Sequence, residues 1–544
     1  MLKASIQSEG VINLFDSKSV GENFSLFDPH ILEEIAKMKE KNIVVEILRK
    51  LMTEQISLYK RTNVVKAEKF SEKIAQLMNA YYNGLITNEE VIKELGVNAV
   101  QLIPIYDQAN DERPNDDPTR TDGSVRAFNW GYNPLNYNAL DGIYSSDPYD
   151  GYARIIEFKE MIKAYNESGI NIIMDVVYNH VAGLEGSNFD VLMPKYYFRY
   201  SAGVASNGSG CGNETASEMP MYRKFMIDST EFWAKEYKLG GFRFDLMGVH
   251  DITTMNELTA NLHNNVNAAI TVYGEPWTGG TIALSGTAAS QSNVNRFQGY
   301  GQFNDKMRDA LIKGGLNSAT SKGWVTNNAT VNNTDLNELI NGFKGITLSK
   351  ELDPSKSVNY VTCHDNYTLY DRIRASGTTN EVLVKRMAML ANSCVFTSQG
   401  ITFMLAGEEM LRTKGGNSNS YEASYAVNAI DYSLKVKHLD MFNNYKALIA
   451  LKQNADVFGK NATQIASDVT VEKNENGSLI IMKIKDTSNN LEYIICHSNG
   501  VNGTKVVNLE GYTLYLDTLN QSNLELTSET RLSPYQTIIA SKSN

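Results

Sequence analysis

The segments GINIIMDVVYNH (169–180), GFRFDLMG (241–248), AAITVYGEPW (268–277) and VNYVTCHDN (358–366) decide the fold of this 544-residue chain. Each begins with an apolar, strand-forming run and carries a carboxylate, a histidine or an arginine toward its carboxyl end. In a β/α barrel the strands are buried, and reactive side chains extend from their carboxyl ends into a common site. The four segments therefore predict a barrel with one chemically active end.

The alternation of strands and helices extends over most of the chain. From Val97 onward, strand-like runs alternate with helical segments such as GYARIIEFKEMIKAYNESG (151–169) and STEFWAKEYKLG (229–240), which implies a parallel sheet. Seven strands can be counted, whereas a closed barrel of this type has eight. We therefore expect an α/β fold, a (β/α)8-type TIM barrel that lacks its first strand. The expected divisions are a helical block over 1–95, the barrel over 96–455 with an inserted loop at about 181–225, and an antiparallel β-sandwich over 456–544.

The composition limits the classes of function. A net charge of −11 argues against a general nucleic-acid binder and fits a neutral partner such as a polysaccharide. The four cysteines are scattered without a CxxC spacing, and no closely spaced acidic ligands occur, so we expect no cofactor and no required metal. The first residues lack the pattern of a secretory signal, and no apolar run is long enough to cross a bilayer. We therefore expect a cytoplasmic protein without a membrane partner.

Three carboxylates in these segments suit the hydrolysis of a glycosidic bond. Arg243 lies two residues before Asp245, so both side chains share one strand face, where the guanidinium can keep a nucleophilic carboxylate ionised. Glu275 is followed by Trp277, and an apolar wall raises the pKa of a carboxyl, as a proton donor requires. Asp365 is placed to contact sugar hydroxyls and to support positive charge. A separation of roughly 5–5.5 Å between the nucleophile and the acid would predict retention of configuration.

Each motif has a plainer interpretation when it is taken alone. Tripeptides such as RFD or GEP more often mark an ion pair or a turn, and His180 by itself would more often be a structural histidine. The four motifs occur together, each at a strand end, and this joint arrangement favours catalysis over coincidence.

Several longer motifs make residues 96–544 similar to type I pullulanases, a group within the α-amylase superfamily of glycoside hydrolases. The hallmark of that family, YNWGYDP, is matched here by FNWGYNP (128–134), and the four segments above resemble the signature regions of the superfamily. The further matching motifs are VQLIPIYD (100–107), YSSDPYDGYARIIEFK (144–159), MPKYYFR (193–199) and LRTKGGNSNSY (411–421).

The resemblance implies a hydrolase that cleaves α-1,6 branch linkages in pullulan, glycogen or limit dextrins. Carried over by motif, it makes Asp245 the nucleophile, Glu275 the general acid/base and Asp365 the transition-state stabiliser. Phe128 and Asn133 depart from the hallmark, which leaves a neopullulanase or α-1,4 amylase type of hydrolase as the alternative. The expected substrate-binding residues are Tyr132, Asp175, His180, Arg243, Trp277 and His364.

Residues 14–95 resemble a different family, the C-terminal helical region of the R subunit of type I restriction enzymes. The similar stretches are FSLFDPHILEEIAKM (24–38), KNIVVEILRKLM (41–52) and RTNVVKAEKFSEKIAQLMNAYYN (61–83), and the plainer alternative is a generic helical bundle. The resemblance implies a fusion whose helical block contacts restriction–modification subunits. An incomplete barrel exposes strand edges, so we also expect reduced or absent activity, and the second hypothesis is an inactive fusion.

Overall fold

The structure is a computed structural model that describes residues 88–109, 129–326, 333–347, 353–521 and 524–543. The chain divides into two compact units, residues 1–86 and residues 87–544. Most of the predicted helical block lies outside the described residues, as does Phe128. The described part begins with helix α4 (Asn88–Leu95), which ends at Gly96, a residue in the left-handed region with φ of +80°.

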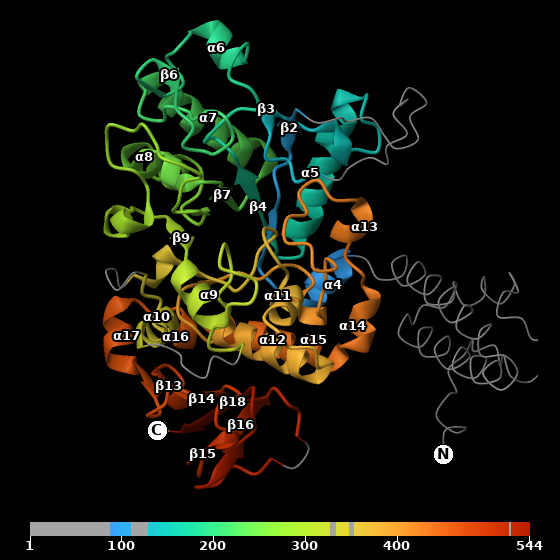
Figure 1. The fold of residues 1–544 in the computed structure, drawn as a ribbon, viewed down its shortest axis with the longest axis vertical. Coiled ribbons are helices and arrows are strands. Elements are labelled where there is room, and N and C mark those ends of the chain that lie inside the picture. The colour runs from blue at the N-terminus through green and yellow to red at the C-terminus, as the bar shows by residue number, and fades with distance from the viewer. Residues whose placement is uncertain (1–87, 110–128, 327–332, 348–352, 522–523, 544) are drawn as a thin grey trace, which may run out of the picture. The chain divides into compact units, whose positions relative to one another are not determined.

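A parallel sheet of seven strands forms the centre of the second unit (Figure 1). Spatial order follows chain order, as expected for successive βα units, and every neighbouring pair is parallel. This arrangement of parallel strands in chain order confirms the predicted α/β fold of the TIM-barrel type. In order, the strands are β1 (Ala99–Leu102), β4 (Asn171–Val176), β7 (Gly241–Phe244), β8 (Thr271–Gly274), β9 (Gly301–Phe303), β10 (Ser357–Asn359) and β11 (Ile401–Thr402).

Burial distinguishes the middle of this sheet from its ends. Every residue of β7, β9 and β10 is buried, whereas every residue of β1 and β11 is only partly buried. These three strands include the buried polar residues Arg243, Gln302 and Asn359, so their burial depends on the layers packed around them and not on an unbroken apolar sequence. In the part of the chain that the structure describes, β1 pairs only with β4, and β11 pairs only with β10.

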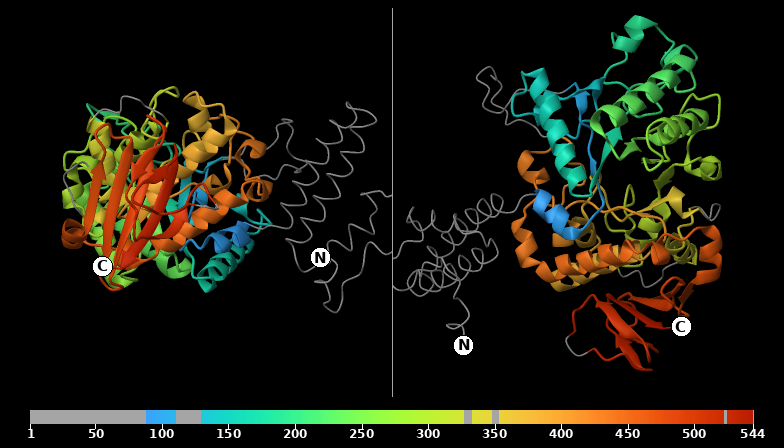
Figure 2. Two further views of the ribbon diagram at one scale, coloured as in Figure 1. Left: turned by 90° about the horizontal axis from the view of Figure 1, so that it is seen from below. Right: turned by 180° about the vertical axis from the view of Figure 1, so that it is seen from behind.

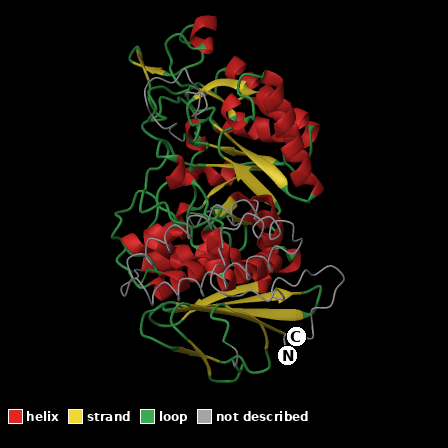
Figure 3. Cartoon of the chain, turned by 90° about the vertical axis from the view of Figure 1, so that its right-hand side faces the viewer, coloured by secondary structure: helices red, strands yellow, loops and turns green. Residues whose placement is uncertain are grey.

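Helices flank the sheet and connect its strands (Figures 1 and 3). Local signals fix several of their starts: Pro220 opens one helix, and the Asn380 side chain accepts hydrogen bonds from the Val382 and Leu383 N–H groups at the start of another. The longer helices are α5 (Gly151–Glu167), α7 (Pro220–Tyr237), α8 (Ile252–Asn265), α9 (Asp305–Ile312), α10 (Asn333–Phe343), α12 (Glu381–Phe396) and α15 (Leu439–Lys452).

Two element boundaries differ from the predictions. Helix α7 begins at Pro220, nine residues before the predicted start at Ser229, because proline fits the first helical position, where no N–H donor is needed. In the segment 358–366 the strand ends at Asn359, since the neighbouring strands β9 and β11 end at the same level and leave no ladder partner beyond it. The residues that follow Asn359 are thereby free to turn.

The C-terminal region forms an antiparallel sheet of five strands and a separate two-stranded sheet (Figure 2). Residues 455–468 come first and contain two short helices, so the first strand begins at Val469. Leu479 and Ile494 of the larger sheet share an apolar cluster with Val507 and Leu532 of the smaller one. The strands are β12 (Val469–Lys473), β13 (Leu479–Asp486), β14 (Leu491–Ser498), β18 (Gln536–Ser543) and β16 (Thr513–Asp517), followed by β15 (Lys505–Val507) with β17 (Thr530–Leu532).

Specific contacts attach this region to the parallel sheet and its helices. The indole N–H of Trp324, a fully buried residue, donates to the Gly477 carbonyl at 2.6 Å. The Phe343 and His497 rings stack with centroids 5.3 Å apart. Helices α12 and α15 lie between the two sheets in Figure 1. Among the described helices, none combines the length and apolarity that a membrane crossing would need.

Candidate active site

Arg243 is the centre of the site and bonds three carboxylates. Its Nη1 atom lies 2.9 Å from Asp175 Oδ1 and 3.0 Å from Asp245 Oδ1, and its Nη2 atom lies 2.6 Å from Glu275 Oε1. Arg243 is 1% exposed and Asp175 is fully buried. Because a buried charge is costly unless it is paired, this guanidinium and its carboxylates depend on one another. We call these four residues the Arg243 cluster.

Sheet register explains why residues far apart in the chain meet here. Asp175 of β4 is the register partner of Arg243 in β7, and Arg243 is the partner of Tyr273 in β8. In-register residues on parallel neighbouring strands point to the same face of the sheet. Asp245 and Glu275 follow directly after β7 and β8, so their carboxylates emerge at the carboxyl edge above this row.

Hydrogen bonds orient the two carboxylates at the strand ends. The Asn179 side-chain amide donates to Asp245 Oδ2 at 2.8 Å, and the Leu246 backbone N–H donates to Glu275 Oε2 at 3.0 Å. Leu246 has φ of +40°, in the left-handed region that non-glycine residues rarely adopt. The turn after β7 therefore takes a costly conformation in which its N–H group meets Glu275.

Burial changes the protonation of the cluster. It raises the pKa of Glu275 to about 7, with the Arg243 charge opposing the rise and the Asp245 charge adding to it. Burial also raises the pKa of Asp175 to about 7, again against the opposing effect of Arg243. A carboxyl with a pKa in this range retains its proton near neutral pH and can act as a proton donor.

Tyr132 connects this cluster with two histidines. Its hydroxyl donates to Asp175 Oδ2 at 2.6 Å and lies 2.9 Å from His364 Nε2, so that nitrogen is the donor to the hydroxyl. The Tyr132 and His364 rings are stacked at 5.2 Å with an interplanar angle of 16°. His180 Nε2 lies 3.2 Å from the Tyr132 carbonyl oxygen. These three predicted residues therefore border the Arg243 cluster.

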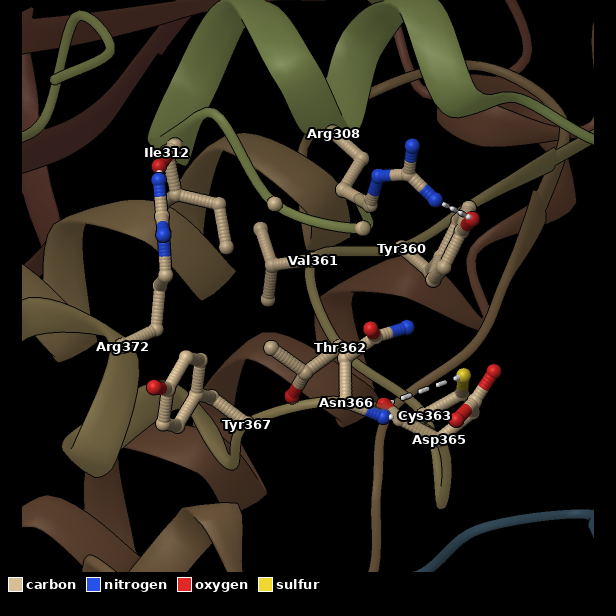
Figure 4. A pocket seen from close by; sticks show the side chains of 12 residues that line it. Arg308, Ile312, Tyr360, Val361, Thr362, Cys363, Asp365, Asn366, Tyr367 and Arg372 are labelled. Carbon is tan, nitrogen blue, oxygen red and sulfur yellow. Dashed lines mark hydrogen bonds between the residues drawn. The ribbon is translucent and has the colours of Figure 1, made fainter. Parts of the chain in front are cut away.

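Asp365 lies at a more open position beside the cluster. Its Oδ1 atom accepts a hydrogen bond of 2.9 Å from the Asn366 N–H. Partial desolvation raises its pKa, while the Asn366 N–H and the Arg243 charge lower it and the Asp245 charge raises it. Figure 4 shows Asp365 at one side of a pocket that is also lined by Arg308 of α9.

Trp277, the ninth predicted residue, is half-buried two residues after Glu275. It packs against the apolar cluster that contains Tyr273, Phe303 and Tyr360. Burial as a whole is the main cause of the raised Glu275 pKa, and the role of the Trp277 indole beside this carboxyl remains a prediction.

Supporting residues were also found that had not been predicted from the sequence. The Tyr273 hydroxyl donates to Gln101 Oε1 at 2.6 Å, and Gln101 Nε2 lies 3.4 Å from Asp175 Oδ2. Lys414 Nζ donates to the His364 carbonyl at 2.8 Å. Gln101 and Lys414 lie in VQLIPIYD and LRTKGGNSNSY, so the motifs were visible, but their bonding partners depend on tertiary contacts.

Side chains of His, Cys, Asp and Glu are not grouped as metal ligands in the described parts of the chain. No group of three or more such side chains in these parts of the chain is arranged to hold a metal ion. The carboxylates of the Arg243 cluster already bond the guanidinium, which supplies the positive charge of the site.

Two family models match parts of the chain. The C-terminal model of type I restriction enzyme HindI endonuclease subunit-like proteins matches residues 1–116, and the α-amylase catalytic domain matches residues 72–191. The first match supports the predicted resemblance of the N-terminal region and extends beyond residues 14–95. The two matches overlap over residues 72–116.

Whole-chain comparisons give pullulanases. The pullulanase of Bacillus subtilis (strain 168) is 33% identical over 451 residues, covering 80% of this chain and 60% of the relative. The pullulanase structure from Bacillus acidopullulyticus has a TM-score of 0.75 at 35% identity, covering 84% of this chain and 56% of that one. A structure from Paenibacillus barengoltzii has a TM-score of 0.75 at 33% identity, covering 84% and 71%. This chain thus spans 60% and 56% of the two Bacillus proteins, and it belongs to the pullulanase family within the α-amylase superfamily.

Proposed function

We propose that this chain hydrolyses α-1,6-glucosidic branch linkages in pullulan, glycogen or limit dextrins with retention of configuration. The proposal rests on the Arg243 cluster, in which one buried guanidinium bonds Asp175, Asp245 and Glu275 at adjoining strand ends. A retaining glycosidase needs one ionised carboxylate and one protonated carboxyl, and this cluster offers an environment for both. Membership of the pullulanase family supports the class of reaction.

The contacts support the following roles. Asp245, held by Arg243 and Asn179, attacks the anomeric carbon, while protonated Glu275 gives its proton to the departing glycosidic oxygen. The ionised Glu275 then takes a proton from the water that hydrolyses the glycosyl–Asp245 ester, which restores both groups. Asp365 supports the positive charge that develops on the sugar ring.

The remaining predicted residues form the surroundings of the reacting sugar. The Tyr132 ring lies beneath the sugar as a stacking surface, and Trp277 shapes the wall beside Glu275. Asp175, His180 and His364 assist at the central sugar, Asp175 from a fully buried position in which it bonds Arg243 and Tyr132. The solved Paenibacillus barengoltzii pullulanase is a complex with maltohexaose and α-cyclodextrin, which supports an α-glucan as the substrate of this chain.

Product analysis on pullulan tests the linkage. Release of maltotriose would support α-1,6 cleavage, whereas panose would indicate the α-1,4 alternative left open by Phe128 and Asn133. Asp245→Asn and Glu275→Gln serve as inactive controls. No release of reducing sugar by the unmodified chain would contradict the proposed activity.

We further propose that the barrel lacks its first strand and that the C-terminal sheets form a β-sandwich. The half-buried end strands β1 and β11 support the first point, and the apolar cluster shared by the two C-terminal sheets supports the second. An open sheet costs stability, so we expect activity below that of pullulanases with a closed barrel. Cleavage of pullulan at ordinary pullulanase rates would contradict this expectation.

The second candidate function is an inactive fusion whose N-terminal block binds restriction–modification subunits. The observation in its favour is the family match over residues 1–116. Co-purification with such subunits in the absence of sugar release would favour it over hydrolysis. The fusion, its subunit partners and the cytoplasmic location remain predictions.

A further inference from the structure

Lys414 is a buried cation beside the proposed active site. It is 4% exposed, and its Nζ atom donates to the His364 carbonyl at 2.8 Å and to Ser420 Oγ at 2.8 Å. The same atom lies 4.9 Å from the centroid of the Trp130 ring. Two hydrogen bonds and a cation–π contact thus replace the water that a buried ammonium group loses.

Hydrogen bonds to the Asp371 carboxylate hold the backbone around Lys414. Its N–H donates to Asp371 Oδ2 at 2.7 Å, and the Thr413 hydroxyl donates to Asp371 Oδ1 at 2.6 Å. Asp371 lies in the first turn of α11 (Leu369–Ala375), and Thr368 caps that helix by accepting from the Asp371 N–H. The ammonium group is therefore carried by a loop that is bonded to the start of a helix.

The Lys414 ammonium group bonds the segment that carries two predicted site residues, His364 and Asp365. His364 supplies the carbonyl acceptor, and Asp365 is the next residue in the chain. The His364 ring in turn contacts Trp130 edge-on at 4.9 Å and stacks on Tyr132. A single cation thus connects the turn after β10 with the segment 130–132 that borders the Arg243 cluster.

We propose that Lys414 is a positioning residue of this site, which holds the His364–Asp365 turn against Trp130 and Tyr132 in the geometry that hydrolysis requires. It acts in the reaction proposed above, so its role rests on that proposed function. Lys414 itself bonds neither the sugar nor the reacting atoms.

Lys452 provides a matched control within the same chain. Its Nζ atom donates to the Ser398 carbonyl and lies 5.2 Å from the centroid of the Phe458 ring, the same combination of carbonyl and aromatic partners. Ser398 precedes β11, so this lysine lies at the amino end of the sheet, away from the site. Burial lowers the pKa of both amines, to about 8 for Lys414 and to about 7 for Lys452.

The titration of Lys414 offers a readout that packing alone would not give. Burial and the Arg412 charge lower its pKa, whereas Cys363, Asp365 and Asp371 oppose this effect. The ammonium form that makes two hydrogen bonds and the cation–π contact is therefore lost as pH rises through about 8. A guanidinium in its place would stay charged over that range.

The experiment uses the full chain with Lys414→Met, Lys414→Arg and Lys452→Met. Pullulan hydrolysis gives kcat and KM, titration with maltotriose gives Kd, and hydrogen exchange reports the order of residues 360–367. We expect Lys414→Met to lower kcat about 10- to 100-fold with a smaller change in KM, since a small misplacement of reacting groups costs about this much. Lys452→Met leaves kcat unchanged. The ratio of unmodified to Lys414→Arg activity falls as pH rises through about 8, because titration of Glu275 is common to both proteins and cancels.

The outcomes separate this role from the proposed activity. Retention of kcat within about twofold by Lys414→Met, or an equal loss in Lys452→Met, would overturn the positioning role. If the unmodified chain neither cleaves pullulan nor binds maltotriose, the proposed function fails, and hydrogen exchange decides the role of Lys414. Faster exchange over 360–367 in Lys414→Met but not in Lys452→Met then shows that Lys414 orders the His364–Asp365 turn even without hydrolysis, and equal exchange overturns that ordering.

Discussion

The middle strands of the parallel sheet and its two end strands differ in both burial and chemistry. Strands β7, β9 and β10 are completely buried, whereas β1 and β11 are partly exposed along their whole length. The Arg243 cluster lies on or directly after β4, β7 and β8, in which all residues but Asn171 and Thr271 are buried, while β1 contributes Gln101, a neutral residue that bonds Tyr273. Desolvation raises the pKa of a carboxyl, so a proton donor that works at neutral pH belongs where the sheet is most deeply buried.

Among the changes considered, replacement of Arg243, the buried cation of the cluster, should have the largest effect on stability and activity. Arg243→Met leaves Asp175, Asp245 and Glu275 without their shared partner, so we expect a loss of about 3–5 kcal/mol in the free energy of unfolding and no measurable hydrolysis. Arg223, a half-buried residue that pairs with Asp251 and Glu257, is the control, and Arg223→Met should cost less than about 1 kcal/mol. Equal costs of the two substitutions in denaturant unfolding would show that burial at the middle of the sheet is not decisive.

Glu275→Gln should remove the proton donor while preserving the shape of the site. We expect kcat on pullulan to fall about 10²- to 10⁴-fold with little loss of stability, because an amide cannot donate a proton to the departing oxygen. Glu338, whose pKa is also raised by burial but which lies on α10, is the control. Unchanged kcat in Glu275→Gln, or an equal loss in Glu338→Gln, would remove Glu275 from the reaction.

The pH dependence of stability tests the effect of burial on Glu275. The pKa of Glu275 is raised from 4.5 to about 7 in the folded chain, so its neutral form contributes stability below about pH 4.5 that is lost as pH rises through about 7. Unfolding measured at pH 5 and pH 8 should therefore show a decrease of about 1–3 kcal/mol that becomes smaller in Glu275→Gln. An identical decrease in both proteins would assign the pH dependence to other groups.

The smallest effect is expected at the end strand. Gln101→Leu removes the acceptor of the Tyr273 hydroxyl and the amide near Asp175, which should cost about 1 kcal/mol of unfolding free energy and a few-fold in kcat. Gln298→Leu, at an exposed glutamine, should stay within about 0.5 kcal/mol. A larger loss of unfolding free energy in Gln101→Leu than in Arg243→Met would show that the end strand contributes more to stability than the Arg243 cluster does.

Much of this site could be predicted because its residues lie next to strands. Apolar runs located the strands, and the charged residues that follow them, such as Asp245 and Glu275, had to emerge at the carboxyl edge. The end of β10 was not predictable, because it depends on where β9 and β11 stop. The partners of Gln101 and Lys414 were likewise not predictable, since hydrogen bonds across 74 and 50 residues leave no local signal.

Apolar periodicity and motif spacing are local properties of the chain, so the order of the βα units, the residues at the strand ends and the resemblance to pullulanases could be recognised without a structure. The bonding of one guanidinium to three carboxylates, and the burial that raises the pKa of Glu275 to about 7, depend on how the strands pack in three dimensions. Register between neighbouring strands and exclusion of water are collective properties of the folded sheet, and no segment carries them alone.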